Sequence, residues 1–161
     1  MVRLTDLTSY ADAIAHFSND ALWALFDGDR ERLNIAHECI DRHASDPARI
    51  AVRIAHDDGR DEAISFATIA AWSSRFAHFL ADQNIQRGDR IAVMLEPSLA
   101  FYACIFGCMK FGAIAVPMFT LFGPEGARHR LEDCSPTLLI TSQAKADEIG
   151  TIEGHAVIVP D

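Results

Sequence analysis

The sequence has few cysteines, few turn-forming residues and no surplus of positive charge. Its 161 residues include 4 cysteines, 9 glycines and 6 prolines, and the formal net charge is -9. So few scattered cysteines do not build a disulfide framework, and they predict a reducing, cytoplasmic setting. The glycine and proline content excludes collagen-like and low-complexity chains. Because nucleic-acid binding requires Lys and Arg to neutralise phosphates, the surplus of carboxylates argues against nucleic acid as a partner.

The sequence also lacks the signals that direct a protein to a membrane. Residues 1–6 contain no basic start followed by an apolar run, so no secretory signal is expected. Residues 99–122 are nearly all apolar, but Lys110 would lie at the middle of a membrane helix and Pro117 would break its second half. A central lysine costs about 2.5–3.5 kcal/mol on insertion scales. We therefore expect no membrane span, but a buried helix, a glycine turn and a buried strand.

No nucleotide-binding or hydrolase motif is complete. The Gly-x-Gly-x-x-Gly pattern of dinucleotide-binding proteins is absent, and so is the Gly-x-Ser-x-Gly elbow. Gly107 and Gly112 have the spacing of a phosphate-binding loop, but Ala113 and Ile114 stand where Lys and Ser or Thr are required. A helix-packing glycine and a helix C-cap explain these two glycines, and no catalytic residue is assigned.

Two pairs of potential metal or redox residues are spaced four apart. Cys39 and His43 share one predicted helix face, but a stable zinc site needs three or four ligands and no matching pair stands out. We expect Cys39 in the core and His43 at the surface, with no metal bound. Cys104 and Cys108 lie among aromatic and aliphatic neighbours, which favours small core residues over a redox pair.

Half of the residues are hydrophobic and 23% are charged, which is the balance of one globular domain. Residues 1–45 have helical periodicity, and Asn34 is a candidate cap for a helix that continues to His43. Short apolar runs predict strands at 50–54, 62–66, 90–95, 114–117, 137–141 and 157–159. Amphipathic spacing or capping residues predict helices at 68–83, 98–111, 124–133 and 144–149.

From residue 68 onward, helices and strands alternate. This order predicts the α/β class: an open, doubly wound, mostly parallel sheet with helices on both faces and right-handed crossovers. A helical N-terminal segment and a hairpin precede it. We divide the chain into a helical lead-in at 1–48 and an α/β unit at 49–161.

One loop has the position of a ligand site. Residues 119–126 follow the predicted strand at 114–117 and precede a helix, and ligands of open α/β sheets gather at such strand ends and helix N-termini. Gly123 would let a ligand approach the backbone closely. The alternative is an ordinary connection without a function.

Together these segments resemble the N-terminal region of the AMP-forming acyl-CoA synthetase superfamily, above all the acetyl- and medium-chain acyl-CoA synthetases. Most of the chain is covered, and no single piece is diagnostic, but the order and spacing are specific. The stretches that carry the likeness are residues 33–38, 71–80, 86–95, 107–117, 121–125 and 130–133.

The resemblance implies a two-step ligase reaction within fatty-acid metabolism. A carboxylic acid attacks the α-phosphate of ATP with Mg²⁺ present, and the thiol of coenzyme A then displaces AMP from the acyl-adenylate. The family's Ser/Thr/Gly-rich phosphate loop ending in Pro-Lys-Gly, its ribose-binding aspartate and its catalytic lysine are absent from residues 1–161. We therefore expect this chain alone to be an inactive N-terminal part of the adenylating domain.

The resemblance also assigns a cofactor contact. Leu121, Phe122 and Gly123 match a family loop that lies near coenzyme A. Arg128 and Arg130 are within possible reach of phosphates, although Arg130 is expected to form a surface ion pair with a carboxylate such as Glu132 or Asp133.

Three hypotheses stay open from the sequence alone. The first is the ligase fragment, which would self-associate through an uncovered sheet face. The second is a stand-alone module that binds coenzyme A or a partner protein without catalysis. The third is a small flavodoxin-like domain with another ligand.

Overall fold

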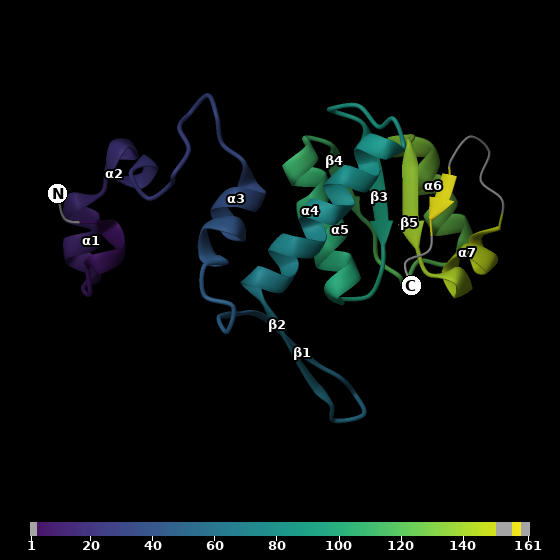
Figure 1. Cartoon of the computed structure of the whole chain (residues 1–161), viewed down its shortest axis with the longest axis horizontal. Coiled ribbons are helices and arrows are strands. Elements are labelled where there is room, and N and C mark those ends of the chain that lie inside the picture. The colour runs from purple at the N-terminus through teal and green to yellow at the C-terminus, as the bar shows by residue number, and fades with distance from the viewer. Residues whose placement is uncertain (1–2, 151–155, 159–161) are drawn as a thin grey trace.

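A four-stranded parallel sheet with helices on both faces forms the body of the protein, and a hairpin and a helical lead-in lie to one side (Figure 1). The computed structural model describes residues 3–150 and 156–158. The lead-in and hairpin comprise η1 (Leu4–Asp6), α1 (Tyr10–His16), α2 (Asn19–Trp23), α3 (Ile35–Cys39), η2 (Asp41–His43), β1 (Ile50–Ala55) and β2 (Asp61–Ser65). The α/β unit, which includes the hairpin, continues with α4 (Phe66–Asp82), β3 (Arg90–Met94), α5 (Leu99–Phe111), β4 (Ile114–Pro117), α6 (Pro124–Cys134), β5 (Leu138–Thr141), α7 (Gln143–Ile149) and β6 (Ala156–Ile158).

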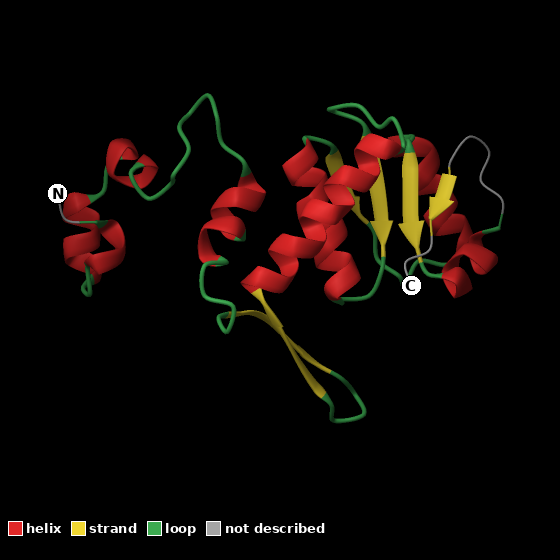
Figure 2. Cartoon of the chain, in the orientation of Figure 1, coloured by secondary structure: helices red, strands yellow, loops and turns green. Residues whose placement is uncertain are grey.

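The sheet has the strand order β4-β3-β5-β6, and every neighbouring pair is parallel (Figure 2). Ile91 on β3 lies opposite Ala115 on β4 and Leu138 on β5, which fixes the register of three strands. The chain steps from β3 to β4 on one side and then crosses back to β5 on the other side, so right-handed crossovers bring α5 and α6 to opposite faces of the sheet. The predicted α/β class and doubly wound sheet are confirmed. The strand expected at 157–159 is β6, with Val159 outside the described residues.

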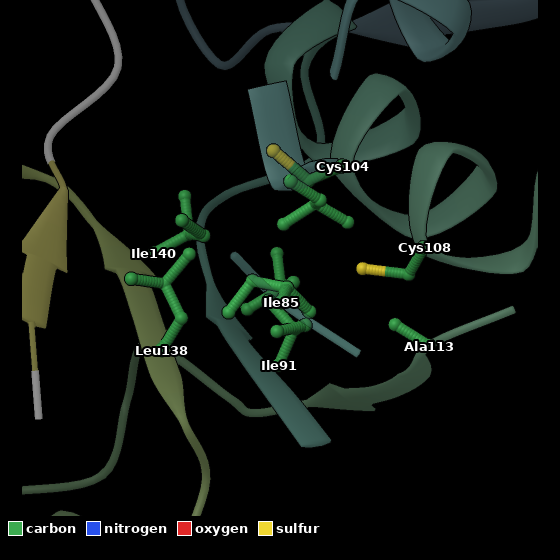
Figure 3. Close-up of a cluster of buried hydrophobic side chains, with 9 residues drawn as sticks. Ile85, Ile91, Cys104, Cys108, Ala113, Leu138 and Ile140 are labelled. Carbon is green, nitrogen blue, oxygen red and sulfur yellow. The ribbon is translucent and has the colours of Figure 1, made fainter. Parts of the chain in front are cut away.

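The first core layer lies between the sheet and the helices α4 and α5. Alternate strand residues such as Ile91 and Ile140 face Leu80 on α4 and the two cysteines of α5. Figure 3 shows Cys104 and Cys108 beside these aliphatic side chains. Burial raises the pKa of both thiols to about 12, so both are neutral at physiological pH. They are packing residues, as their apolar neighbours in the sequence predict.

The second core layer covers the opposite face of the sheet. Met94 and Leu139 point to this side and pack against Leu131 on α6 and Ile149 on α7, all of them fully buried. Strands that are covered on both faces have continuous apolar sequences, which is the pattern of residues 90–95 and 137–141. No helix in the described part of the chain is long and apolar enough to cross a membrane.

The ends of α5 follow the sequence signals. The Ser98 hydroxyl accepts a hydrogen bond of 3.2 Å from the amide of Phe101 at the N-terminus. At the C-terminus, Gly112 adopts φ +90°, the left-handed conformation that glycine takes without strain. Between them, Gly107 packs against α4: a Cβ there would lie 2.8 Å from the carbonyl oxygen of Ser73.

The lead-in is less regular than the sequence predicts. Its helices are short, and no residue from 3 to 33 is buried. Asn34 caps α3 as expected, but this α-helix ends at Cys39 and is followed by the 3₁₀ turn η2. The expectation that Cys39 lies in the core is wrong, because its side chain is exposed and Ala36 and Ile40 occupy the buried positions.

A buried ion pair fixes the base of the lead-in. The Glu38 carboxylate accepts hydrogen bonds from the amides of Gly28 (2.8 Å) and Asp27 (3.1 Å), and it pairs with Arg42, which also donates to the Leu25 carbonyl at 2.9 Å. Burial alone raises the pKa of Glu38, but the two amides and Arg42 outweigh it and hold the pKa below its usual value. The loop before α3 is therefore held by charge-assisted hydrogen bonds.

The close contact at Gly107 predicts a large effect of one methyl group. Gly107→Ala is expected to destabilise the protein by about 1–3 kcal/mol in urea unfolding, because the new Cβ would overlap Ser73 and Phe76 on α4. Gly126→Ala in α6 is the matched control. Its Cβ would meet ordinary contacts only, so the higher helix propensity of alanine should raise stability by about 0.5–1 kcal/mol. Equal effects of the two substitutions would contradict this account.

Candidate functional site

The carboxyl ends of the parallel strands define one edge of the sheet. β3, β4 and β5 end at Met94, Pro117 and Thr141, and the loops that follow share this edge. The chain leaves β3 toward β4 on one side, while β5 lies on the other side, so the point between β3 and β5 is a topological switch point. Ligands of open α/β sheets bind at such points. The Thr141 hydroxyl donates to the Met94 carbonyl at 3.0 Å and joins the two strand ends there.

An open cleft of about 730 Å³ lies at this switch point. Its charged lining consists of Glu62 from the hairpin, Glu96 from the loop after β3, and Lys145 and Glu148 from α7. The ammonium of Lys145 is paired with Glu148, and the hydroxyl of Thr120 donates to the Glu96 carboxylate. Three carboxylates against one ammonium give the cleft a negative balance.

This charge distribution decides what the cleft fits. A triphosphate requires Lys, Arg or oriented amides, and the one lysine of the cleft already has a carboxylate partner. A bound Mg²⁺ needs several oxygen ligands in one place, and within residues 3–150 and 156–158 no group of three His, Cys, Asp or Glu side chains comes together. The charged side chains of the cleft therefore do not fit ATP with Mg²⁺.

The loop between β4 and α6 carries the predicted site residues. Leu121 is 90% exposed and Phe119 72%, whereas Phe122 is half-buried against the second core layer. Gly123 is exposed, and a Cβ at this position would meet nothing within 4 Å. Leu121 and Phe119 also line a groove of about 510 Å³ between this loop and the loop after β3. The structure thus brings Leu121, Phe122 and Gly123 to the carboxyl edge of the sheet.

The two arginines of α6 differ from each other. Arg128 donates to the carbonyl of Ile149 at 2.8 and 3.1 Å and so closes the end of α7. The Arg130 guanidinium lies 3.8 Å above the ring of Phe122, and its Nη1 donates to the carbonyl of Gly126 at 2.9 Å. The expected ion pair of Arg130 with a carboxylate is absent from the described residues, because the side chain turns back toward the start of α6 instead.

The sequence predicted that the loop at 119–126 follows a strand and precedes a helix, which the structure confirms, but it did not predict the cleft. Glu96 and Ser142 follow the predicted strands at 90–95 and 137–141, so the rule that ligands gather at strand ends could have indicated both. The carboxylate of Glu62 could not be found in this way, because it reaches the cleft from the separate hairpin.

Comparison with known proteins identifies the class. The sequence profile of the family described as AMP-binding enzyme matches residues 40–160. Its members are adenylate-forming enzymes, and the doubly wound sheet agrees with solved members of that class. The chain belongs to the AMP-binding enzyme family, and its resemblance to the N-terminal region of acyl-CoA synthetases is confirmed.

Two acetyl-coenzyme A synthetases show how much longer such relatives are than this chain. An acetyl-coenzyme A synthetase of Bacillus subtilis is 31% identical over 147 residues, which are 89% of this chain and 26% of that protein. One of Burkholderia lata is 33% identical over 116 residues, which are 71% of this chain and 18% of that protein. The chain thus spans about a fifth to a quarter of these relatives.

Solved structures show the same fold. An acyl-CoA synthetase of Brucella canis matches 96% of this chain and 29% of its own, with a TM-score of 0.82 and 30% identity. MatB of Rhodopseudomonas palustris matches 78% of this chain with a TM-score of 0.64 at 24% identity, which shows the fold alone.

The exposure of Leu121 makes a prediction about stability. Leu121→Ser should change the free energy of unfolding by less than about 0.5 kcal/mol, because the side chain contributes little to the core. Leu131→Ala, at a fully buried position of the neighbouring helix, should cost about 2–5 kcal/mol. Urea unfolding measures both. A large loss of stability for Leu121→Ser would mean that this leucine is structural.

Proposed function

We propose that this chain is the N-terminal part of the adenylate-forming domain of an ATP-dependent, AMP-forming acyl-CoA ligase. The observation that carries the proposal is the match to the Brucella canis acyl-CoA synthetase, which includes nearly all of this chain but less than a third of that enzyme. Residues 1–48 are the helical lead-in of this part and residues 49–161 its α/β unit. In the whole enzyme, a carboxylic acid would react with ATP, and coenzyme A would then accept the acyl group.

The chemistry of this chain supports a positioning role and no catalytic one. The cleft at the switch point opposes phosphate groups by its charge. In this proposal the catalytic residues, ATP and Mg²⁺ are held by segments outside residues 1–161. The protein acts in the reducing cytoplasm, where its four free cysteines persist as thiols.

Coenzyme A is the substrate that this region would contact, through Leu121, Phe122 and Gly123. Gly123 is the residue before α6 and has no side chain that could cap the helix, and Pro124 is the first residue of α6. The backbone of the loop is thus open to a ligand, while Leu121 and Phe119 offer apolar surface for the pantetheine arm. The contact from Leu121 and Gly123 would be made largely by backbone and apolar groups.

The surface of the chain supports its place in a larger unit. A compact monomer of 17.7 kDa exposes about 7,900 Å² by the usual scaling, whereas this chain exposes 10197 Å². A standard interface takes about 800 Å² from each partner, so the excess is large enough for more than one interface. Part of it is the exposed apolar side of α1, formed by Tyr10, Ile14 and Phe17.

A second uncovered surface lies on the sheet itself. An apolar groove of about 520 Å³ runs between α4, α5 and the strands β5 and β6, with Trp72, Phe76, Phe79, Ile140 and Ile158 in its lining. Trp72 is 47% exposed there. In a complete domain this groove would be covered by further polypeptide.

The reading frame and the exchange reaction test the ligase assignment. The frame downstream of Asp161 should encode a Ser/Thr/Gly-rich loop ending in Pro-Lys-Gly. The 161-residue chain itself should show no ATP–pyrophosphate exchange above background with acetate, butyrate or octanoate, because the phosphate loop is missing from it. Acid-dependent exchange by this chain would contradict the proposal, and a stop codon after Asp161 would favour the stand-alone module.

The uncovered groove predicts self-association of the isolated chain. Sedimentation equilibrium should show dimers or larger species, because apolar surface of this extent is driven out of water. Trp72→Glu should shift the distribution toward monomer, since it places a charge in the groove. Arg53→Glu, at an exposed hairpin position, should leave it unchanged. A stable monomer at every concentration would indicate an autonomous domain.

A further inference from the structure

Arg130 has an unusual environment for a surface arginine. Its guanidinium is stacked over the ring of Phe122 at 3.8 Å, and one of its nitrogens donates to the carbonyl of Gly126. These two contacts hold the side chain across the first turn of α6, directly behind the exposed tip of the loop. The long side chain of a surface arginine is normally mobile. Because two contacts hold Arg130, its guanidinium is already oriented before any ligand binds.

The start of α6 leaves room for this position of Arg130. A Cβ on Gly126 would lie 3.6 Å from Nη1 of Arg130 and 3.9 Å from the Cβ of Phe122, which are ordinary van der Waals distances, so the position does not depend on the glycine. The stack occupies one face of the guanidinium and the Gly126 carbonyl accepts from Nη1, while Nε and Nη2 have no acceptor among the described residues.

The charges around Arg130 leave it open to an anion. In the described part of the chain, no Asp or Glu oxygen lies within 4.0 Å of this guanidinium. Arg128, only two residues away, donates from Nε and Nη2 to the Ile149 carbonyl. Both arginines of α6 are held in place, and each keeps at least one nitrogen that has no acceptor among the described residues. Of the two, Arg130 is the one stacked on the ring of Phe122 beside the exposed loop tip.

The neighbouring surface indicates what kind of anion fits. Phe119 packs edge-on against Phe122 with ring centroids 6.0 Å apart, and Phe119 and Leu121 are both largely exposed. An apolar and aromatic surface beside a pre-oriented guanidinium suits a ligand that joins phosphate groups to a flat base or an apolar arm. Inorganic anions would use the guanidinium alone.

We propose that Arg130 binds the phosphate groups of coenzyme A while the loop tip contacts its organic part. The proposal rests on the assignment of coenzyme A as the substrate of this loop. It adds a residue from α6 to Leu121, Phe122 and Gly123, and it makes Phe122 the platform that aims the guanidinium. The ligand chemistry required is an adenosine bearing two or more phosphates.

Titrations of the ¹⁵N-labelled 161-residue chain followed by NMR test this proposal. The ligands are coenzyme A, 3′,5′-ADP, which carries phosphates without the arm, and pantetheine, which carries the arm without phosphates. Arg130→Gln should weaken coenzyme A and 3′,5′-ADP by about tenfold, the loss of one good phosphate contact. Pantetheine shifts should be unaffected. Arg130→Lys keeps the charge and should show an intermediate loss, because it lacks the planar stack.

Arg53→Gln is the matched control, since it removes the same charge from an exposed position on the hairpin. Unchanged affinity of Arg130→Gln for coenzyme A would overturn the role of Arg130 and leave the loop assignment standing. An equal loss of pantetheine binding would mean that Arg130 only shapes the loop, and it would also overturn the proposal. If the wild-type chain bound none of the three ligands, both the role of Arg130 and the coenzyme A contact of the loop would be rejected. The ligase assignment is tested separately by the reading frame beyond Asp161.

Discussion

One buried ammonium holds the two parts of this chain together. Nζ of Lys110, on α5, lies 2.7 Å from Asp41 of η2 and donates to the Ala70 carbonyl and the Ser74 hydroxyl of α4. Only 13% of the lysine side chain is exposed, and a buried charge without partners costs several kcal/mol. The three acceptors come from two other elements, so the charge is satisfied only when η2, α4 and α5 are all in place. The lead-in is thereby locked to the α/β unit.

The same lysine explains how an almost wholly apolar helix belongs to a protein core. In residues 99–122 it is the one charge in a long apolar run, and its partners are supplied by protein. Nearby, the Asn34 amide caps α3 and donates from its other end to the Met109 carbonyl at 3.1 Å. These polar contacts fix the angle between α3 and α5, and the pair of Glu38 with Arg42 then sets the loop before α3. Polar groups thus determine where the lead-in lies, while apolar burial stabilises the sheet.

Sequence patterns predicted the sheet well because each of its signals is local. Gly112 and Ser98 mark the ends of α5 by backbone chemistry, and the apolar runs around Ile91 and Leu139 mark strands that are covered on both faces. The lead-in was predicted less well because its contacts are distant in sequence, as between Asn34 and Met109. The position of the loop at Leu121 could be predicted because the loop follows an apolar strand pattern. The stack of Arg130 on Phe122 could not be predicted, because no sequence pattern indicates a side chain that turns back along its own helix.

Electrostatics divides the carboxyl edge into two unlike halves. On one side, three glutamates and an already paired lysine surround the cleft between β3 and β5, so a phosphate group placed there would meet net negative charge. On the other side, the loop after β4 exposes apolar side chains, and Arg130 behind it has no carboxylate partner within residues 3–150 and 156–158. Of the three glutamates, Glu96 also borders the groove of this loop. The glutamates therefore disfavour an anionic ligand in the cleft, even though the cleft lies at the switch point. In the proposed contact with coenzyme A, the charge of the side chains, more than the topology of the sheet, would set which strand end receives the phosphate groups.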